Sequence, residues 1–543
     1  MGEYLERAPD AHSRNYLDSS TSIGSSGSKI PSLRNATIAE LSSLLENGSV
    51  KSVDLTKTYL ARIAEVNDYF RAVIETNPDA VEIAQALDLE QTRTGKRRGP
   101  LHGIPILVKD IFNTNDAMHT TAGSLCLLGA RTHKEAAVIE KLRAAGAVIL
   151  GKTNLAEWGM VRTSKGGSGW TARGGLTRGA YVENMKASGS SSGSAVSAAL
   201  GLAAVCVGAE TDGSIISPSS RANVVGLKPT PGLISSEGAI PVALKQDTPG
   251  PIARTVADVV YLLDVLADQP DGSANNYAAS LTGGDLSGLR NGIPESGFPA
   301  ADNEHLQAFQ KALHVLKDAG AVLITDIAYE GFADFQKLSR DEQTCAMLGA
   351  FKLDIASYVK ALDRNPRHLT SLDDIIEFIK SDPGEEYPSR GIEMFEIAQK
   401  LDLEGQDYKK ALARDVYFGG VGGIPGLLKS HGLDVIAVPA MQGPSISFAA
   451  RAGTPAIVVP LGKYSDNAAV KSLTSGPDHY VDVAPNVPFG IAFLGDKWSE
   501  TKLLRVANAF EQITQVRESI PLFNPPKTEL HGYDAGSTKS SRM

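Results

Sequence analysis

The stretch Asn184–Ser220 reads NMKASGSSSGSAVSAALGLAAVCVGAETDGSIISPSS, and it contains two Gly/Ser-rich loops separated by an apolar segment. The small residues of the first loop, 188–194, let the backbone approach a ligand closely and leave hydroxyl groups available. The second loop begins at Thr211 and contains Ser214. Two serine-rich loops so close in sequence are a candidate site for chemistry on hydroxyl groups.

The apolar segment determines whether the two loops can meet. Residues 195–202 are rich in Ala and Leu and predict a helix with Ser194 as its N-cap, whereas the β-branched residues in 203–208 favour a buried strand. A helix leaves the first loop at ~1.5 Å per residue, and a strand returns at ~3.3 Å per residue over a comparable distance. The pattern therefore predicts that both loops lie on one rim, where Ser190 and Ser214 can come together.

The bulk composition restricts the classes of partner. The 543 residues are 42% hydrophobic and 21% charged, which is enough apolar sequence for a large core. A formal net charge of −9 argues against a nucleic-acid partner, because proteins that bind nucleic acids concentrate basic residues on one surface. Three cysteines lie far apart without metal-ligand spacing, which favours a reducing compartment and gives no support for a metal site.

Targeting signals are weak in this sequence. The first residues, MGEYLERAPD, are polar and lack the apolar region of a secretory signal. The longest apolar stretch, Ala195–Ala209, is interrupted by small polar residues and is shorter than the ~20 residues of a membrane span. We therefore expect a soluble, cytoplasmic protein. A peroxisomal location is the alternative, because the last residues, Ser541-Arg542-Met543, resemble the Ser-Lys-Leu type of address.

Repeated helix-glycine-strand units predict the fold class. Residues 134–150 and 303–324 each read as a helix, a glycine and an apolar strand, the second strand segment DAGAVLI resembling the first, AAGAVIL. Such units favour an α/β architecture in which helices cover both faces of a sheet. No composition shift marks a linker, so we expect one domain over 33–525.

Three further segments complete the expected organisation. Residues 1–32 are rich in Ser, Gly and charge and are expected to form a mobile tail, and 526–543 a second, C-terminal tail. The segment 286–424 carries no recognisable motif, and we expect it to shape the substrate entrance.

A lysine at the end of a strand supplies the candidate base. Lys109 directly follows the short apolar strand predicted over 104–108, where burial would favour its neutral amine. A neutral lysine can take the proton of a serine hydroxyl, and Ser-Lys pairs are a known alternative to the Ser-His-Asp arrangement. The tight loop Thr211–Ser214 follows the second strand, so its backbone N–H groups could converge as an oxyanion hole.

Several motifs in a fixed order resemble the amidase signature family. The paired serine loops match its signature, and the resemblance extends over roughly 33–522. The supporting segments are GPLHGIPILVKD at Gly99–Asp110, GKTNLAEW at Gly151–Trp158, VVGLKPT at Val224–Thr230 and QDTPGPIART at Gln246–Thr255. This resemblance implies the amidase signature fold, with a central mixed β-sheet covered by helices on both faces.

The resemblance also implies roles for individual residues. Ser214 corresponds to the nucleophile, Lys109 to the general base, and Ser190 to the bridging serine that relays the proton and typically sits on a cis peptide bond. Ser191 would support this network by hydrogen bonding. The oxyanion hole would be formed by the backbone N–H groups of Thr211, Asp212, Gly213 and Ser214. Neither a metal nor an organic cofactor is implied.

The sequence departs from the family pattern at three positions. Ile111 replaces the commoner Asn, Asp212 stands where many members have Gly, and Ile216 stands where many have Arg. The form Glu-Thr-Asp-Gly-Ser occurs in fungal-type members, so Asp212 does not argue against activity. The missing arginine leaves the orientation of this loop open.

Two other motif matches do not indicate the functions usually associated with those motifs. Gly189–Gly193 fits the G-x-S-x-G elbow of α/β-hydrolases with Ser191 in the centre, but the elbow requires a preceding strand and 183–187 is polar. GAVILGKT at Gly146–Thr153 fits the phosphate-loop pattern, although its central residues read as an apolar strand and not as a pliable loop. We expect neither a classical elbow nor a nucleotide site.

The predicted function is that of a stand-alone amidase, which hydrolyses a small-molecule carboxamide to a carboxylic acid and ammonia or an amine. The alternatives are an amidotransferase A-type subunit, which would need partner subunits, and a noncatalytic scaffold that retained the fold. Trp158 either lines the acyl pocket or fills the core. The sequence leaves the substrate, and whether the protein forms a homodimer, open.

Overall fold

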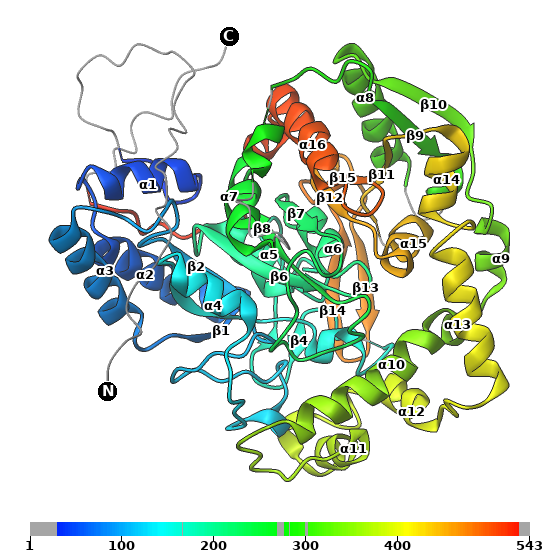
Figure 1. Cartoon of the computed structure of the whole chain (residues 1–543), viewed down its shortest axis with the longest axis horizontal. Coiled ribbons are helices and arrows are strands. Elements are labelled where there is room, and N and C mark those ends of the chain that lie inside the picture. Colours follow the sequence, from blue (N-terminus) through cyan, green and yellow to red (C-terminus); the bar gives the residue numbers. More distant parts are fainter. Residues whose placement is uncertain are drawn as a thin grey trace, which may run out of the picture.

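The computed structural model describes residues 30–165, 167–268, 276–281, 283–298, 302–441 and 443–531. Their centre is a mixed sheet of 11 strands covered by helices (Figure 1), which confirms the predicted α/β class. In spatial order the strands are β1 (Val73–Thr76), β3 (Val148–Thr153), β2 (Pro105–Lys109), β6 (Val205–Glu210), β8 (Thr248–Ala253), β7 (Val225–Lys228), β12 (Ala456–Lys463), β15 (Pro488–Leu494), β11 (Val435–Pro439), β9 (Arg290–Pro294) and β10 (Val322–Ile327).

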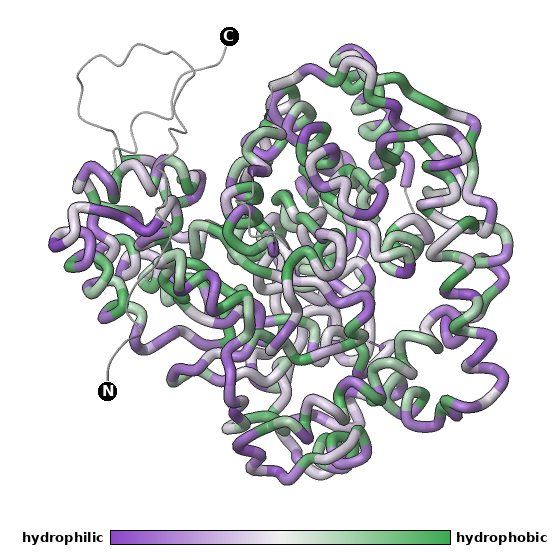
Figure 2. The backbone as a smooth tube through the Cα atoms, in the orientation of Figure 1, coloured by the Kyte–Doolittle hydropathy of each residue, from purple (hydrophilic) through white to green (hydrophobic). Residues whose placement is uncertain are grey.

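Sixteen helices are assigned within the described ranges. They are α1 (Ile38–Glu46), α2 (Ser52–Phe70), α3 (Ala80–Thr94), α4 (Ala137–Ala144), α5 (Ser192–Leu200), α6 (Ile216–Arg221), α7 (Val256–Leu266), α8 (Asn303–Asp318), α9 (Phe332–Lys337), α10 (Arg340–Lys360), α11 (Leu372–Ser381), α12 (Glu393–Lys400), α13 (Gln406–Phe418), α14 (Ile424–His431), α15 (Pro444–Ala452) and α16 (Glu500–Thr514). The peripheral helices alternate hydrophilic and hydrophobic colours in Figure 2, as amphipathic helices over a core do. None of the described helices is long and apolar enough to span a membrane.

The register of the strands explains why the quoted loops meet. Strand β2 pairs in parallel with both β3 and β6, so Lys109 at the end of β2 lies at the same edge as the loop that follows β6. Helix α5 connects the first serine loop to β6, and all of its residues are buried. The predicted helix-strand return between the two loops is therefore present.

The start of α5 differs from the sequence-based expectation. The helix begins at Ser192, with Ser191 and not Ser194 at the N-cap position. The Ser194 hydroxyl is instead hydrogen-bonded to Thr153 Oγ1 at 2.7 Å and to the backbone oxygen of Val207 at 3.2 Å. Ser194 fastens the first turn of the helix to the sheet, a tertiary role that local sequence does not reveal.

The two predicted tails lie mostly outside the described residues, as does the tripeptide Ser541-Arg542-Met543. The described part of the C-terminal segment packs against α2. The Arg62 side chain donates to the backbone oxygen of Thr528, and the Glu529 carboxylate accepts hydrogen bonds from Ser32 Oγ at 2.6 Å and from the Leu33 N–H at 2.7 Å. Residues 528–529 therefore join the body of the protein.

Gly193 in the first turn of α5 lies against the backbone of neighbouring segments. A Cβ at this position would come within 2.2 Å of the Ala72 oxygen and 2.5 Å of the Asn154 oxygen. Because backbone atoms cannot move aside cheaply, we expect Gly193→Ala to lower the free energy of unfolding by about 1–3 kcal/mol. Urea denaturation would measure this loss. Gly284→Ala is the matched control, since a Cβ there meets only Ile513 side-chain atoms at 3.6 Å. Equal midpoints for both variants would contradict the tight packing.

Candidate active site

Lys109 lies at the centre of a buried polar cluster. Its side chain projects from the end of β2, and the residue is 2% exposed. Its Nζ lies 2.7 Å from Ser190 Oγ, 3.1 Å from Ser191 Oγ and 3.1 Å from the backbone oxygen of Ala209. The strand end and the first serine loop are thus brought together as the sequence predicts.

The surroundings of Lys109 fit a neutral amine. Burial lowers the pKa of Lys109 to about 7, against the opposing influence of the Asp247 and Glu210 carboxylates. A neutral amine has two N–H groups and one lone pair. Lys109 Nζ donates to Ser190 Oγ, Ser191 Oγ and the Ala209 oxygen, and in the neutral form two of these contacts use N–H groups while the third is left for the lone pair. The short distance between Nζ and Ser190 Oγ is one at which a proton can pass between them.

Ser191 has its own hydrogen bonds. Its hydroxyl donates to the Ala209 oxygen at 2.9 Å and accepts from the Ala209 N–H at 3.2 Å, in addition to its contact with Lys109. Because its proton is already donated, Ser191 fits a supporting role better than that of a nucleophile. The residues before it, 183–187, form a turn and isolated bridges but no strand of the sheet, so the elbow interpretation fails.

Ser190 and Ser214 lie on the two facing loops. The Gly189–Ser190 peptide bond is cis. Ser214 is 8% exposed, and its backbone oxygen accepts a hydrogen bond from the Ser191 N–H at 3.1 Å, which ties the two loops together. Among the described residues, the hydroxyls of Ser190 and Ser214 are not hydrogen-bonded to each other. The structure thus places Lys109 and Ser190 in direct contact and Ser214 beside them.

Glu210 holds the start of the helix that follows Ser214. Its carboxylate accepts hydrogen bonds from the Ile215 N–H at 2.7 Å and the Ile216 N–H at 3.0 Å. Burial raises the pKa of Glu210, while the Lys228 ammonium and these N–H groups oppose that rise. Within the described residues, the N–H groups of Thr211 and Ser214 donate to no other group. They remain candidates for an oxyanion hole.

Asp247 fixes the other side of the 211–214 loop. Its carboxylate accepts a short hydrogen bond from the Thr211 hydroxyl and further bonds from the N–H groups of Val242 at 2.8 Å and Ala243 at 3.0 Å. One partly buried carboxylate therefore fixes Thr211 relative to the segment that contains Val242. Asp247 lies in the motif Gln246–Thr255, but the sequence pattern indicates no role for it.

Asp212 is oriented by residues from α15, far along the chain. Its carboxylate accepts hydrogen bonds from Ser447 Oγ at 3.1 and 3.2 Å and lies 3.7 Å from the Arg451 guanidinium. Arg451 also pairs with Asp415 at 2.9 Å. The sequence lacks the family's arginine at Ile216, and Arg451 supplies a guanidinium to the same loop from another element. No local pattern around 451 could have indicated this.

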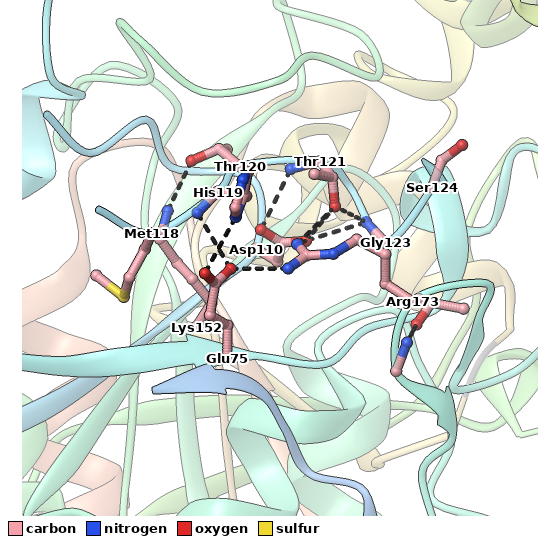
Figure 3. A network of polar contacts seen from close by, with 12 residues as sticks. Glu75, Asp110, Met118, His119, Thr120, Thr121, Gly123, Ser124, Lys152 and Arg173 are labelled. Atoms are coloured by element: carbon pink, nitrogen blue, oxygen red, sulfur yellow. Dashed lines mark hydrogen bonds and ion pairs between the residues drawn. The ribbon is translucent and has the colours of Figure 1, made fainter. Parts of the chain in front are cut away.

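The loop after Lys109 is held by a second buried network (Figure 3). The Asp110 carboxylate accepts hydrogen bonds from the Thr121 hydroxyl at 2.7 Å and the Gly123 N–H at 3.2 Å, and Arg173 lies between Asp110 and Glu75. Burial raises the pKa of Asp110, against the opposing charges of Arg173 and Lys152. The network fixes the loop that follows Lys109.

Lys152 belongs to this network and not to a phosphate site. Its Nζ donates to the Phe112 backbone oxygen at 2.6 Å and to Thr120 Oγ1 at 2.7 Å, and the residue is fully buried in β3. The residues that match the phosphate-loop pattern therefore include strand β3, and Lys152 in this strand fixes the 112–120 loop by hydrogen bonds. Within the described ranges, no group of three or more His, Cys, Asp or Glu side chains is arranged to hold a metal ion.

Two cavities meet at the cluster. A wide cleft of about 650 Å³ contains Ser214 and Asp212, and segment 286–424 contributes the lining residues Phe335, Arg340, Gln343, Met347 and Met394. A narrow cavity of about 30 Å³ contains Lys109 and Ser190, and its apolar walls are Ile111, Phe112, Trp158, Ile240, Pro241 and Val242. Trp158, left undecided by the sequence, lines the narrow cavity.

The site thus combines a buried lysine in contact with two serine hydroxyls and an adjoining cleft that contains Ser214. The sequence matches the amidase family over residues 54–504. The crystal structure of native peptide amidase from Stenotrophomonas maltophilia superimposes with a TM-score of 0.79 at 36% identity, covering 91% of this chain and 99% of that chain.

Two curated relatives differ in how much of the chain they match. A protein of Arthroderma benhamiae named "Putative amidase" is 39% identical and covers 93% of this chain and 89% of its own. The glutamyl-tRNA(Gln) amidotransferase A-type subunit of Chloroflexus aurantiacus is 38% identical but covers 54% of this chain and 60% of its own. The chain belongs to the amidase family. It is an enzyme, a hydrolase of amide carbon–nitrogen bonds.

Replacing Arg451 tests the contact between α15 and the 211–214 loop. In Arg451→Met the Asp212 carboxylate loses its guanidinium neighbour, and we expect kcat to fall by about 10- to 100-fold through misplacement of the loop. Steady-state kinetics on an amide substrate would measure the fall. Arg414→Met is the matched control, because Arg414 pairs with Glu342 on the surface. Equal kcat values for the two variants would show that α15 does not position this loop.

Proposed function

We propose that the protein hydrolyses carboxamides through an acyl-enzyme on Ser214, with Lys109 as general base and Ser190 as proton relay. The observation that carries this proposal is the 2.7 Å contact between Lys109 Nζ and Ser190 Oγ, in a site that lowers the pKa of Lys109 to about 7. A lysine with this pKa is neutral in a large fraction of molecules near pH 7, as a general base must be.

The first half of the reaction forms the acyl-enzyme. The Ser214 hydroxyl passes its proton to Ser190, Ser190 passes its own proton to Lys109, and the Ser214 oxygen bonds to the amide carbon. The resulting oxyanion is stabilised by the backbone N–H groups of Thr211 and Ser214, whereas the Gly213 N–H donates to the Glu210 carboxylate. When the tetrahedral intermediate collapses, Lys109 returns a proton through Ser190 to the leaving nitrogen. The carbon–nitrogen bond breaks, and ammonia or an amine leaves.

The second half releases the acid. Water gives a proton through Ser190 to Lys109, and its oxygen attacks the ester carbon. The ester bond to Ser214 then breaks, and the Ser214 oxygen recovers a proton from Lys109 by the same relay. Each proton that enters the lysine leaves it again, so the chain is regenerated and the net reaction is amide hydrolysis.

The two other candidate functions have less support. An amidotransferase A-type role rests on a relative that covers only 54% of this chain, whereas the peptide amidase covers 91%. A noncatalytic scaffold would not need a buried lysine in contact with two serine hydroxyls, because burying such a group costs stability. The acyl-transfer site favours the stand-alone amidase.

A fluorophosphonate probe tests the nucleophile, because the attacking serine oxygen displaces fluoride from phosphorus and remains labelled. We expect labelling to be lost in Ser214→Ala and in Lys109→Ala, since the first removes the nucleophile and the second its base. Ser191→Ala is the matched control and should retain part of the labelling. Loss of labelling in Ser191→Ala alone would make Ser191 the nucleophile. Thermal unfolding of each variant shows whether it is folded.

A panel of amides tests the reaction itself. Short aliphatic, aryl, fatty and peptide amides would each be incubated with the protein, and released ammonia would be measured. We expect ammonia from at least one member with the wild-type chain and none with Ser214→Ala. Peptide amides are included because the similar solved structure is a peptide amidase. Ammonia release that survives in Ser214→Ala would overturn the mechanism.

The pKa of Lys109 predicts the pH dependence. The neutral amine is the active form, so kcat/KM should rise with pH through an inflection near 7 and then level off. Asp247→Asn removes a carboxylate that favours the charged lysine, so this variant should move the inflection to lower pH. A profile measured between about pH 5 and pH 9 checks both statements. A flat wild-type profile would rule out Lys109 as the titrating base.

A further inference from the structure

The two cavities divide the residues of the site between them. Lys109 and Ser190 line the narrow cavity, Ser214 lines the wide cleft, and Thr211 lines both. The two cavities adjoin at Thr211, Gly159 and Val242, which line both, and an amide carbon in contact with Ser214 lies in the wide cleft on the Thr211 side of that junction. Its two substituents, the acyl chain and the nitrogen, must point into different spaces.

The proposed chemistry decides which substituent enters which cavity, and the inference rests on that proposed function. The leaving nitrogen receives its proton from Ser190, so it must come within hydrogen-bond reach of Ser190 Oγ. Ser190 and Lys109, the two members of the proposed relay, line the narrow cavity together with the polar residues Thr211, Ser236, Asp247 and Thr248. Any group attached to the nitrogen consequently points into the narrow cavity, while the acyl chain extends along the wide cleft.

The narrow cavity has little room. Its volume is about 30 Å³, and about 10–15 Å³ is needed to hold one water-sized molecule. Ammonia and one further carbon atom fit this space, whereas a ring or a branched alkyl group does not. The walls formed by Trp158 and Phe112 are 1% and 0% exposed, so they are packed from behind by other side chains.

Gly159 and Val242 form the constriction between the two cavities, since both residues line both spaces. A Cβ built on Gly159 would lie 2.7 Å from Val242 Cγ2, which shows how closely the two approach. The Val242 backbone is fixed by its hydrogen bond to Asp247. The opening is therefore held on the Val242 side by the same carboxylate that binds Thr211.

The turn opposite Val242 has an unusual backbone. Trp158, Gly159 and Met160 have φ values of 52°, 67° and 73°, in the left-handed region that Trp and Met rarely adopt. Such a turn persists only where the surrounding structure holds it, and here the Trp158 N–H donates to the Ala122 backbone oxygen at 3.0 Å. The Trp158 ring packs edge-on against Phe395 at 6.0 Å. This wall is held in place on both sides.

We propose that the narrow cavity is the leaving-amine site, that Val242 and Trp158 determine its size, and that it restricts the enzyme to primary carboxamides and N-methyl amides. The acyl part of the substrate is far less restricted, because it occupies a cleft of about 650 Å³. Selectivity thus acts on the amine side of the scissile bond.

A series of amides that differ only in the amine tests this proposal. The series is built on the acid whose primary amide releases ammonia fastest in the panel, with ammonia, methylamine, isopropylamine and benzylamine as leaving groups. We expect kcat/KM to fall by about 100-fold or more from the N-methyl to the N-benzyl amide, since a closed pocket rejects added carbon atoms. Hydrolysis of the N-benzyl amide at the same rate as the primary amide, in a reaction that requires Ser214, would overturn the proposal and leave the proposed function intact.

Val242→Ala widens the constriction and should change the selectivity. We expect the ratio of kcat/KM for the N-isopropyl amide to that for the primary amide to rise by about 10-fold, in line with the removal of two methyl groups from a pocket wall. Val416→Ala is the matched control, because Val416 is 77% exposed on α13. An equal ratio in wild type and Val242→Ala would show that Val242 does not set the limit. Failure of the wild type to hydrolyse any amide would overturn the proposed function as well.

Discussion

The contact between Lys109 and Ser190 is the interaction on which the rest of the site depends. A lysine buried at the end of a strand is costly in its charged form, so the environment must favour the neutral amine. Three oxygens lie within hydrogen-bonding distance of Nζ, and burial lowers the pKa of Lys109 to about 7. Near neutral pH the lysine is therefore neutral in a large fraction of molecules, as the proposed chemistry requires, and among the described residues no carboxylate forms a salt bridge with it.

Nearby carboxylates adjust the pKa of Lys109 and also fix the loop that contains Ser214. Asp247 and Glu210 each favour the charged lysine, which keeps the pKa of Lys109 from falling further. The same two side chains accept hydrogen bonds from Thr211 and from the N–H groups after Ser214. One set of buried charges thus couples the basicity of Lys109 to the position of the loop, so neither property can be altered alone.

Local structure could be predicted from the sequence, whereas contacts between segments far apart in the chain could not. The alternation of Gly/Ser loops with an apolar helix and strand was sufficient to predict that Ser190 and Ser214 share a rim, because the geometry of α5 and β6 follows from their own residues. Arg451 could not be predicted, since its contact with Asp212 depends on how α15 packs against the rest of the chain. The N-cap at Ser191 was missed for the same reason, as Ser194 bonds to β3 and β6 instead of capping α5.

The two cavities are built partly from different segments of the sequence. The narrow cavity takes lining residues from segments that carry recognisable motifs, including Trp158 and 247–249, and others from 236–242, where no motif is recognisable. The wide cleft takes many of its residues from 335–347 and 443–451, where no motif is recognisable. A residue that serves both chemistry and a cavity wall is constrained twice, whereas a residue that only lines the cleft can be exchanged for another of suitable size. In the proposed mechanism the amine side of the site therefore adjoins Lys109 and Ser190, whereas the acyl side is formed largely by residues that only line the cleft.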